Sequence, residues 1–127
     1  MNKQSSIQSK LDEAVEAKRD DLIALTQDLV RIPTLNPPGD CYLEICEYLK
    51  RRLEKSGFDV ELVRAFETPG DSDKYPRWNV IARKEGAQSG DCVHFNSHTD
   101  VVEVGNGWTK DPFGAELDGD LIYGRGT

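Results

Sequence analysis

The chain has 127 residues, of which 37% are hydrophobic and 31% charged, a balance typical of one soluble globular domain. Sixteen Lys and Arg against 23 Asp and Glu give a net charge of −7, which argues against nucleic-acid binding because phosphate contacts need clustered basic side chains. No apolar run approaches the roughly 20 residues needed to cross a membrane, and the first residues lack the apolar core of a signal peptide.

Apolar residues at helical spacing predict a first helix over residues 6–32, with charged residues on its opposite face. The apolar stripe consists of Ile7, Leu11, Val15, Leu22, Leu25, Leu29 and Ile32. Pro33 and the sequence Leu-Asn-Pro-Pro-Gly-Asp at 35–40 end this helix and predict a rigid loop.

A second helix is predicted over residues 41–56, where apolar side chains again recur at helical spacing. Gly57 follows at the position where a left-handed C-terminal cap is expected. The alternating residues 58–63 then predict a strand.

Further strands are predicted over residues 78–82 and 91–97, and a short hairpin over 117–123. In the second of these strands, Val93 and Phe95 share one face. Two helices followed by strands favour an α/β domain in which helices pack on a mixed β-sheet.

The three cysteines, Cys41, Cys46 and Cys92, are odd in number and show no CxxC spacing. A disulfide framework or a zinc-ribbon site is therefore not expected. Reduced thiols in a cytoplasmic protein are the simpler interpretation.

His98 and Asp100 are the candidate site residues, at the point where the predicted strand 91–97 runs into a loop. Residues two apart on a strand point to the same side, about 6.6 Å apart at Cα. This gap suits a histidine that binds a metal through one ring nitrogen and donates its other N–H to a carboxylate. The spacing alone is a weak signal, because a histidine near a strand end is more often structural.

His94 is not expected to share a metal ion with His98, because four residues along a strand span about 13 Å. Bonds from zinc to nitrogen are only about 2.0–2.1 Å long. A packed or hydrogen-bonded strand residue is the simpler role for His94.

Three motifs follow one another between His98 and Gly126. They are His98-Thr99-Asp100-Val101-Val102, Trp108-Thr109-Lys110-Asp111-Pro112-Phe113 and Tyr123-Gly124-Arg125-Gly126. In this order they closely resemble the N-terminal signature of the M20 family of metallopeptidases and amidohydrolases. Arg31-Ile32-Pro33-Thr34 and Asn36-Pro37-Pro38-Gly39 are also similar to the family, so the resemblance covers roughly residues 20–127. Glu103 departs from the proline that many members carry.

The resemblance implies that His98 is the first metal ligand and that Asp100 is the carboxylate of the catalytic centre that orients it. It implies two zinc ions, replaceable by cobalt, and hydrolysis of an amide bond in small N-acyl amino acids or peptides, as in acetylornithine deacetylase or succinyl-diaminopimelate desuccinylase. It further implies a homodimeric, cytoplasmic full-length enzyme. Nucleic-acid and membrane partners are not expected.

The other motif residues have structural interpretations. Trp108 and Phe113 are expected to pack their loop against the domain, and Asp111-Pro112 to set a turn. Gly124 and Gly126 are expected to let the backbone approach the metal centre closely. Arg125 is expected to brace the loop that contains these glycines.

Residues 1–127 are thus expected to be the N-terminal part of a zinc-hydrolase catalytic domain, without the rest of that domain or the second domain. The family's bridging carboxylate and general base would follow Thr127, so the isolated chain is expected to be inactive. Two alternatives stay open: a non-catalytic α/β fragment that acts as an assembly or interaction unit, and an M20-like aminohydrolase with a different substrate. An Asp encoded soon after Thr127 would favour the hydrolase.

Overall fold

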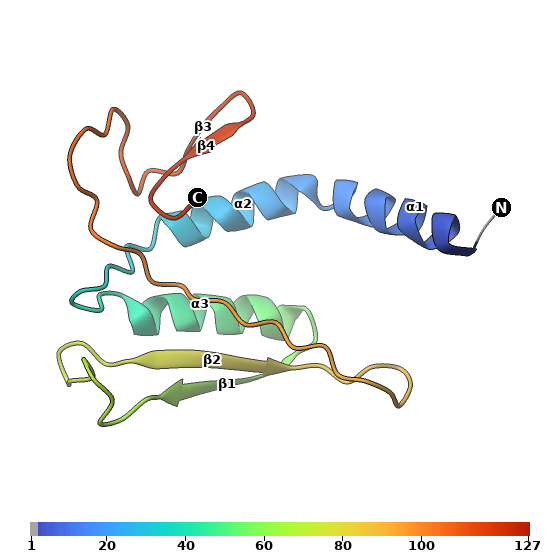
Figure 1. The fold of residues 1–127 in the computed structure, drawn as a ribbon, viewed down its shortest axis with the longest axis horizontal. Helices are drawn as coiled ribbons and strands as arrows, with labels where there is room; N and C mark the ends of the chain where they lie inside the picture. The colour runs from blue at the N-terminus through green and yellow to red at the C-terminus, as the bar shows by residue number, and fades with distance from the viewer. Residues whose placement is uncertain (1–2) are drawn as a thin grey trace. The chain divides into compact units, whose positions relative to one another are not determined.

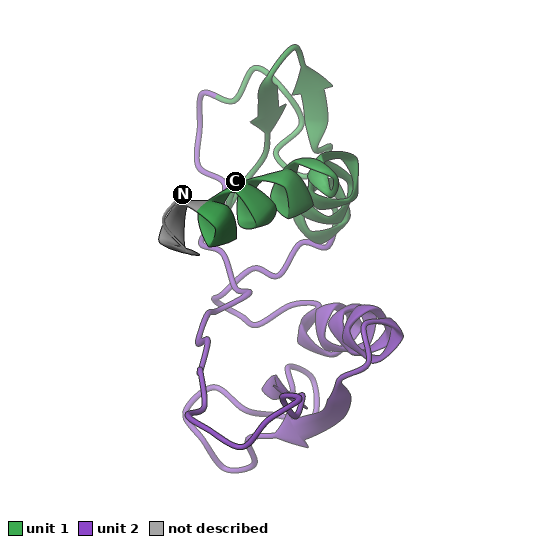
Figure 2. Ribbon diagram, turned by 90° about the vertical axis from the view of Figure 1, so that its right-hand side faces the viewer, with its two compact units in different colours: residues 1–31, 108–127 green, residues 32–107 purple. Residues whose placement is uncertain are grey.

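The computed structural model describes residues 3–127, which divide into two compact units. One unit contains the residues up to Arg31 together with Trp108–Thr127, and the other contains Ile32–Gly107 (Figure 2). None of the helices in this described part combines the length and apolar character that a membrane-spanning segment requires.

The first unit contains two helices where the sequence predicts one. α1 (Lys3–Glu16) and α2 (Arg19–Val30) are separated by a turn at Ala17 and Lys18 (Figure 1). The prediction of a continuous helix is therefore wrong at this point. Lys18 leaves the helical conformation, and the acidic residues Asp20 and Asp21 in the first turn of α2 favour a new helix N-terminus there.

The predicted hairpin at 117–123 is confirmed as β3 (Glu116–Asp118) and β4 (Leu121–Tyr123), which pair antiparallel. Gly119 turns the chain with a φ of +60°, a conformation that glycine adopts without strain. Ala115 is fully buried before β3, and its carbonyl accepts a hydrogen bond of 2.8 Å from the Gln27 side chain.

The second unit is built on α3 (Tyr42–Lys55), which lies along the antiparallel pair β1 (Asp59–Arg64) and β2 (Trp78–Arg83), as Figure 1 shows. These elements confirm the second predicted helix and the first two predicted strands. Their buried core consists of Ile45, Cys46 and Val60. Burial raises the pKa of the Cys46 thiol to about 11, as expected for a reduced, unreactive cysteine.

The α/β class is confirmed, with the described strands in two antiparallel pairs rather than in one mixed sheet. The strand predicted over residues 91–97 is wrong for this structure. The segment has no ladder partner, and Val93 and Phe95 are 75% and 88% exposed. Alternating apolar residues favour a strand only where a neighbouring edge pairs with them.

Candidate functional site

Within the second unit, the loop before α3 holds the segment that carries His98. The Thr34 hydroxyl donates a hydrogen bond of 2.5 Å to the carbonyl of Thr99. The Val101 N–H donates to the Thr34 carbonyl at 2.9 Å, and the Asn36 N–H donates to the Val101 carbonyl at 2.8 Å. Thr34 is only 2% exposed, so the side of this attachment that Thr34 forms is shielded from water.

His98 and Asp100 lie in contact, as their spacing predicts. Nδ1 of His98 is 3.0 Å from Oδ1 of Asp100 and 3.0 Å from the Asp100 backbone oxygen. Both partners are acceptors, so Nδ1 carries the hydrogen, and the neutral ring then has its lone pair on Nε2. The side chain of His98 is 84% exposed, which leaves a nitrogen lone pair accessible to a ligand.

The second carboxylate oxygen of Asp100 is also bound. The side-chain amide of Asn36 donates a hydrogen bond of 2.8 Å to Oδ2. This bond, and to a smaller degree the bond from His98, holds the pKa of the Asp100 carboxyl below its usual range. Asp100 is therefore kept as the anion, the form that accepts hydrogen bonds from both neighbours.

Tyr42 and Arg77 border the same carboxylate, although the sequence did not single them out. The Arg77 guanidinium lies 5.0 Å from the centre of the Tyr42 ring. Burial, followed by the neighbouring charge of Asp100, raises the pKa of the Tyr42 hydroxyl. Asn36, Tyr42 and Arg77 come from three separate stretches, so no local motif marks them as a group.

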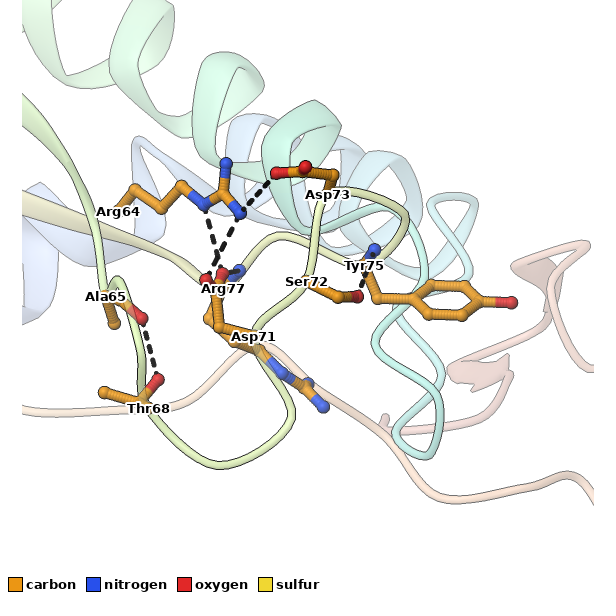
Figure 3. A network of polar contacts seen from close by, with 8 residues as sticks. All are labelled: Arg64, Ala65, Thr68, Asp71, Ser72, Asp73, Tyr75 and Arg77. Atoms are coloured by element: carbon orange, nitrogen blue, oxygen red, sulfur yellow. Dashed lines mark hydrogen bonds and ion pairs between the residues drawn. The ribbon is translucent and has the colours of Figure 1, made fainter.

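A network of polar contacts fixes the connection between β1 and β2, in which Arg77 lies (Figure 3). Arg64 binds Asp71 through Nε and Nη2 at 3.1 and 3.2 Å, and it also contacts Asp73. Asp71 accepts a further hydrogen bond of 2.9 Å from the backbone N–H of Arg77. Its side chain is only 6% exposed, so it organises the connection from within.

This network predicts a specific sensitivity to acid. The hydrogen bond from Arg64, followed by that from the Arg77 N–H, lowers the pKa of Asp71. A carboxyl with a lowered folded pKa contributes stability above its unfolded pKa of about 3.9, and this contribution is lost as the pH falls through the folded pKa. We expect the melting temperature to fall as the pH drops below about 5 and through the lowered pKa of Asp71, and this fall to be smaller in Asp71→Asn.

Asp73→Asn is the matched control, because Asp73 also contacts Arg64 but its side chain is fully exposed. Its melting temperature should depend on pH as the unsubstituted protein's does. An unchanged acid dependence in Asp71→Asn would contradict the prediction.

The described residues offer one candidate metal ligand, His98, with a carboxylate behind it. Among residues 3–127, no three or more His, Cys, Asp and Glu side chains gather closely enough to hold a metal ion. His94 is exposed, and nothing places it with His98. A catalytic zinc site needs about three protein ligands, so His98 fits one position of such a site and the described residues do not complete it.

The remaining motifs belong to the first unit. The Arg125 guanidinium lies 5.2 Å from the centre of the Trp108 ring. Asp111 accepts the Phe113 N–H at 2.9 Å, which matches the turn predicted there. A Cβ on Gly124 would collide with the side chain of Val30, so within this unit glycine is required for close packing against α2.

Comparison with curated proteins shows that the chain is similar to succinyl-diaminopimelate desuccinylases. It is 39% identical to that of Cereibacter sphaeroides and 40% identical to that of Dinoroseobacter shibae, each over 108 residues, which are 84% of this chain and 25% of the relative. The enzyme of Novosphingobium aromaticivorans is 34% identical over 106 residues, 84% of this chain and 26% of the relative. The chain thus spans about a quarter of the length of the curated relatives it matches. No family model and no solved structure matches the chain.

Proposed function

Because the chain belongs to the M20 family, we propose that residues 1–127 are the N-terminal part of the catalytic domain of a zinc-dependent hydrolase. Its reaction is the cleavage of an amide bond in a small N-acyl amino acid. The observation that carries the proposal is the His98–Asp100 contact, in which a carboxylate and a carbonyl hold Nδ1 and leave Nε2 accessible. A cytoplasmic location and a homodimer belong to the same proposal.

In this proposal His98 binds zinc through Nε2, and ligands from the rest of the complete protein fill the other positions. When bound, zinc would supply Lewis-acid chemistry, polarising the substrate carbonyl and making water a better nucleophile at neutral pH. Asp100 accepts the Nδ1–H of His98, fixes the ring, and makes the imidazole a stronger donor to the metal. Thr34 and Asn36 hold the backbone on either side of Asp100.

The proposed substrate class follows the names of the relatives, which are desuccinylases. N-succinyl-diaminopimelate is therefore the first candidate, with N-acetylornithine and simple N-acyl amino acids beside it. The test is hydrolysis of this panel by the complete protein supplied with zinc or cobalt. Release of succinate or acetate that stops when the metal is chelated supports the proposal. Absence of hydrolysis across the panel in a metal-loaded protein contradicts it.

Asp100→Asn should leave the fold intact but weaken zinc affinity or turnover by roughly 10–100-fold, because the carboxylate acts on the metal through His98. The amide keeps an oxygen that can accept the His98 hydrogen, but it lacks the negative charge, and its NH₂ then faces the Asn36 NH₂ where Oδ2 of Asp100 accepts a hydrogen bond. Zinc affinity is measured by competition with a chromophoric chelator, and turnover on the best substrate of the panel. Affinity and turnover equal to those of the unsubstituted enzyme would remove Asp100 from the site.

A further inference from the structure

The orientation of Asp100 depends on a residue far away in the sequence. Its Oδ1 faces the His98 ring, and its Oδ2 accepts the hydrogen bond from the Asn36 amide at 2.8 Å. Asn36 and Asp100 are 64 residues apart in the chain. With one partner on each oxygen, rotation of the carboxylate away from His98 breaks the bond to Asn36.

The Asn36 amide can take this role in only one of its two orientations, because its NH₂ must face the carboxylate. Arg77 selects that orientation: its Nη1 donates a hydrogen bond of 3.1 Å to Oδ1 of Asn36. A flipped amide would set its NH₂ against the guanidinium, donor against donor, and its oxygen against the carboxylate. Arg77 therefore determines which group Asn36 offers to Asp100.

Arg77 is itself held on several sides. Its Nη2 donates a hydrogen bond of 3.0 Å to the carbonyl of Pro38, and its guanidinium lies over the Tyr42 ring. It also occupies space that two glycines leave open: a Cβ on Gly39 or Gly70 would lie 2.5 Å from one of its nitrogens. No real Cβ approaches a nitrogen so closely, so a larger residue at either glycine would displace the guanidinium.

We infer that Asn36 and Arg77 are positioning residues, which hold Asp100 and through it the His98 ring in the geometry of a metal ligand. The inference rests on the proposed function for its link to zinc, whereas its effect on His98 exists in the metal-free protein. The chain of contacts runs from Arg77 to Asn36, Asp100 and His98.

The test is Asn36→Leu in the complete protein, with two measurements. Nitrogen NMR on histidine-labelled, metal-free protein reports which ring nitrogen of His98 carries the hydrogen, with the signal assigned by its loss in His98→Ala. We expect a dominant Nδ1–H form in the unsubstituted protein and a mixture with the Nε2–H form in Asn36→Leu. Zinc affinity, measured by chelator competition, should fall by about 10-fold, the lower end of the range for groups that orient a ligand.

Thr34→Val separates this role from a general loosening of the loop. It removes a buried hydrogen bond to Thr99 but touches neither the His98 ring nor the Asp100 carboxylate. We expect a lower melting temperature with the His98 hydrogen still on Nδ1. If Thr34→Val and Asn36→Leu change the His98 signal equally, the positioning role of Asn36 is overturned.

Arg77→Lys is the second variant, which decides the matter if Asn36→Leu does not fold. Lysine keeps the charge but lacks the two guanidinium nitrogens that donate to Asn36 and Pro38 at the same time. We therefore again expect a mixture of the Nδ1–H and Nε2–H forms of His98. An unchanged His98 signal and zinc affinity in both variants would overturn the inference. Failure of the unsubstituted protein to bind zinc would overturn the proposed function alone, because the NMR measurement needs no metal.

Discussion

His98→Ala in the complete protein is expected to abolish hydrolysis, with a loss well beyond the roughly 10–100-fold expected when a group behind a ligand is removed. His98 offers an exposed Nε2 whose ring is fixed through Nδ1 by Asp100, and alanine supplies no replacement donor. A catalytic zinc site with about three protein ligands does not tolerate the loss of one. Turnover and bound metal per chain, measured by atomic absorption, should both fall.

His94→Ala is the matched control for this substitution. It removes the same side chain four residues earlier in the same irregular segment, where His94 is exposed and outside the proposed site. Activity and metal content should equal those of the unsubstituted enzyme. Preserved turnover in His98→Ala, or equal losses in the two variants, would remove His98 from the site.

The elements predicted correctly are those whose signals are local. α3 follows from its apolar stripe and from Gly57, which ends it. Gly57 takes a φ of +79° and donates its N–H to the backbone carbonyl of Glu54. β1 and β2 follow from alternation, and their register places Val60 opposite Ala82. Residues 91–97 carry an equally clear alternation but form no strand, because pairing depends on a partner edge that the segment's own sequence does not contain.

The contacts of the candidate site also divide into those between sequence neighbours, which the sequence can suggest, and those between distant residues, which it cannot. The contact between His98 and Asp100 joins residues only two positions apart, so the sequence could suggest it, although the strand assumed for that spacing does not form. Asn36 and Arg77 join the same group from positions 64 and 41 residues distant from their partners. The Asn-Pro-Pro-Gly sequence marked a rigid loop, but only the folded chain shows that Gly39 makes room for the Arg77 guanidinium.

Ile45→Ala should have the largest effect on stability among the substitutions considered, about 2–5 kcal/mol, the usual cost of removing a buried isoleucine side chain and leaving a cavity. Ile45 is 3% exposed and lies in the core that α3 forms with β1 and β2. The loss should also reach the site, because Tyr42 at the start of α3 contacts Arg77. Urea denaturation gives the change in the free energy of unfolding, and chelator competition gives the change in zinc affinity.

Leu43→Ala is the control, since Leu43 lies on the same helix but is 38% exposed. It should cost less than about 1 kcal/mol, near the range for surface substitutions, and should leave zinc affinity unchanged. Equal losses of stability in the two variants would show that α3 does not pack on β1 and β2 through Ile45. The combination expected here, a large loss in Ile45→Ala with weaker zinc binding, would instead show that the core beneath α3 holds Tyr42 and Arg77 in place, and through them the Asp100 carboxylate behind His98.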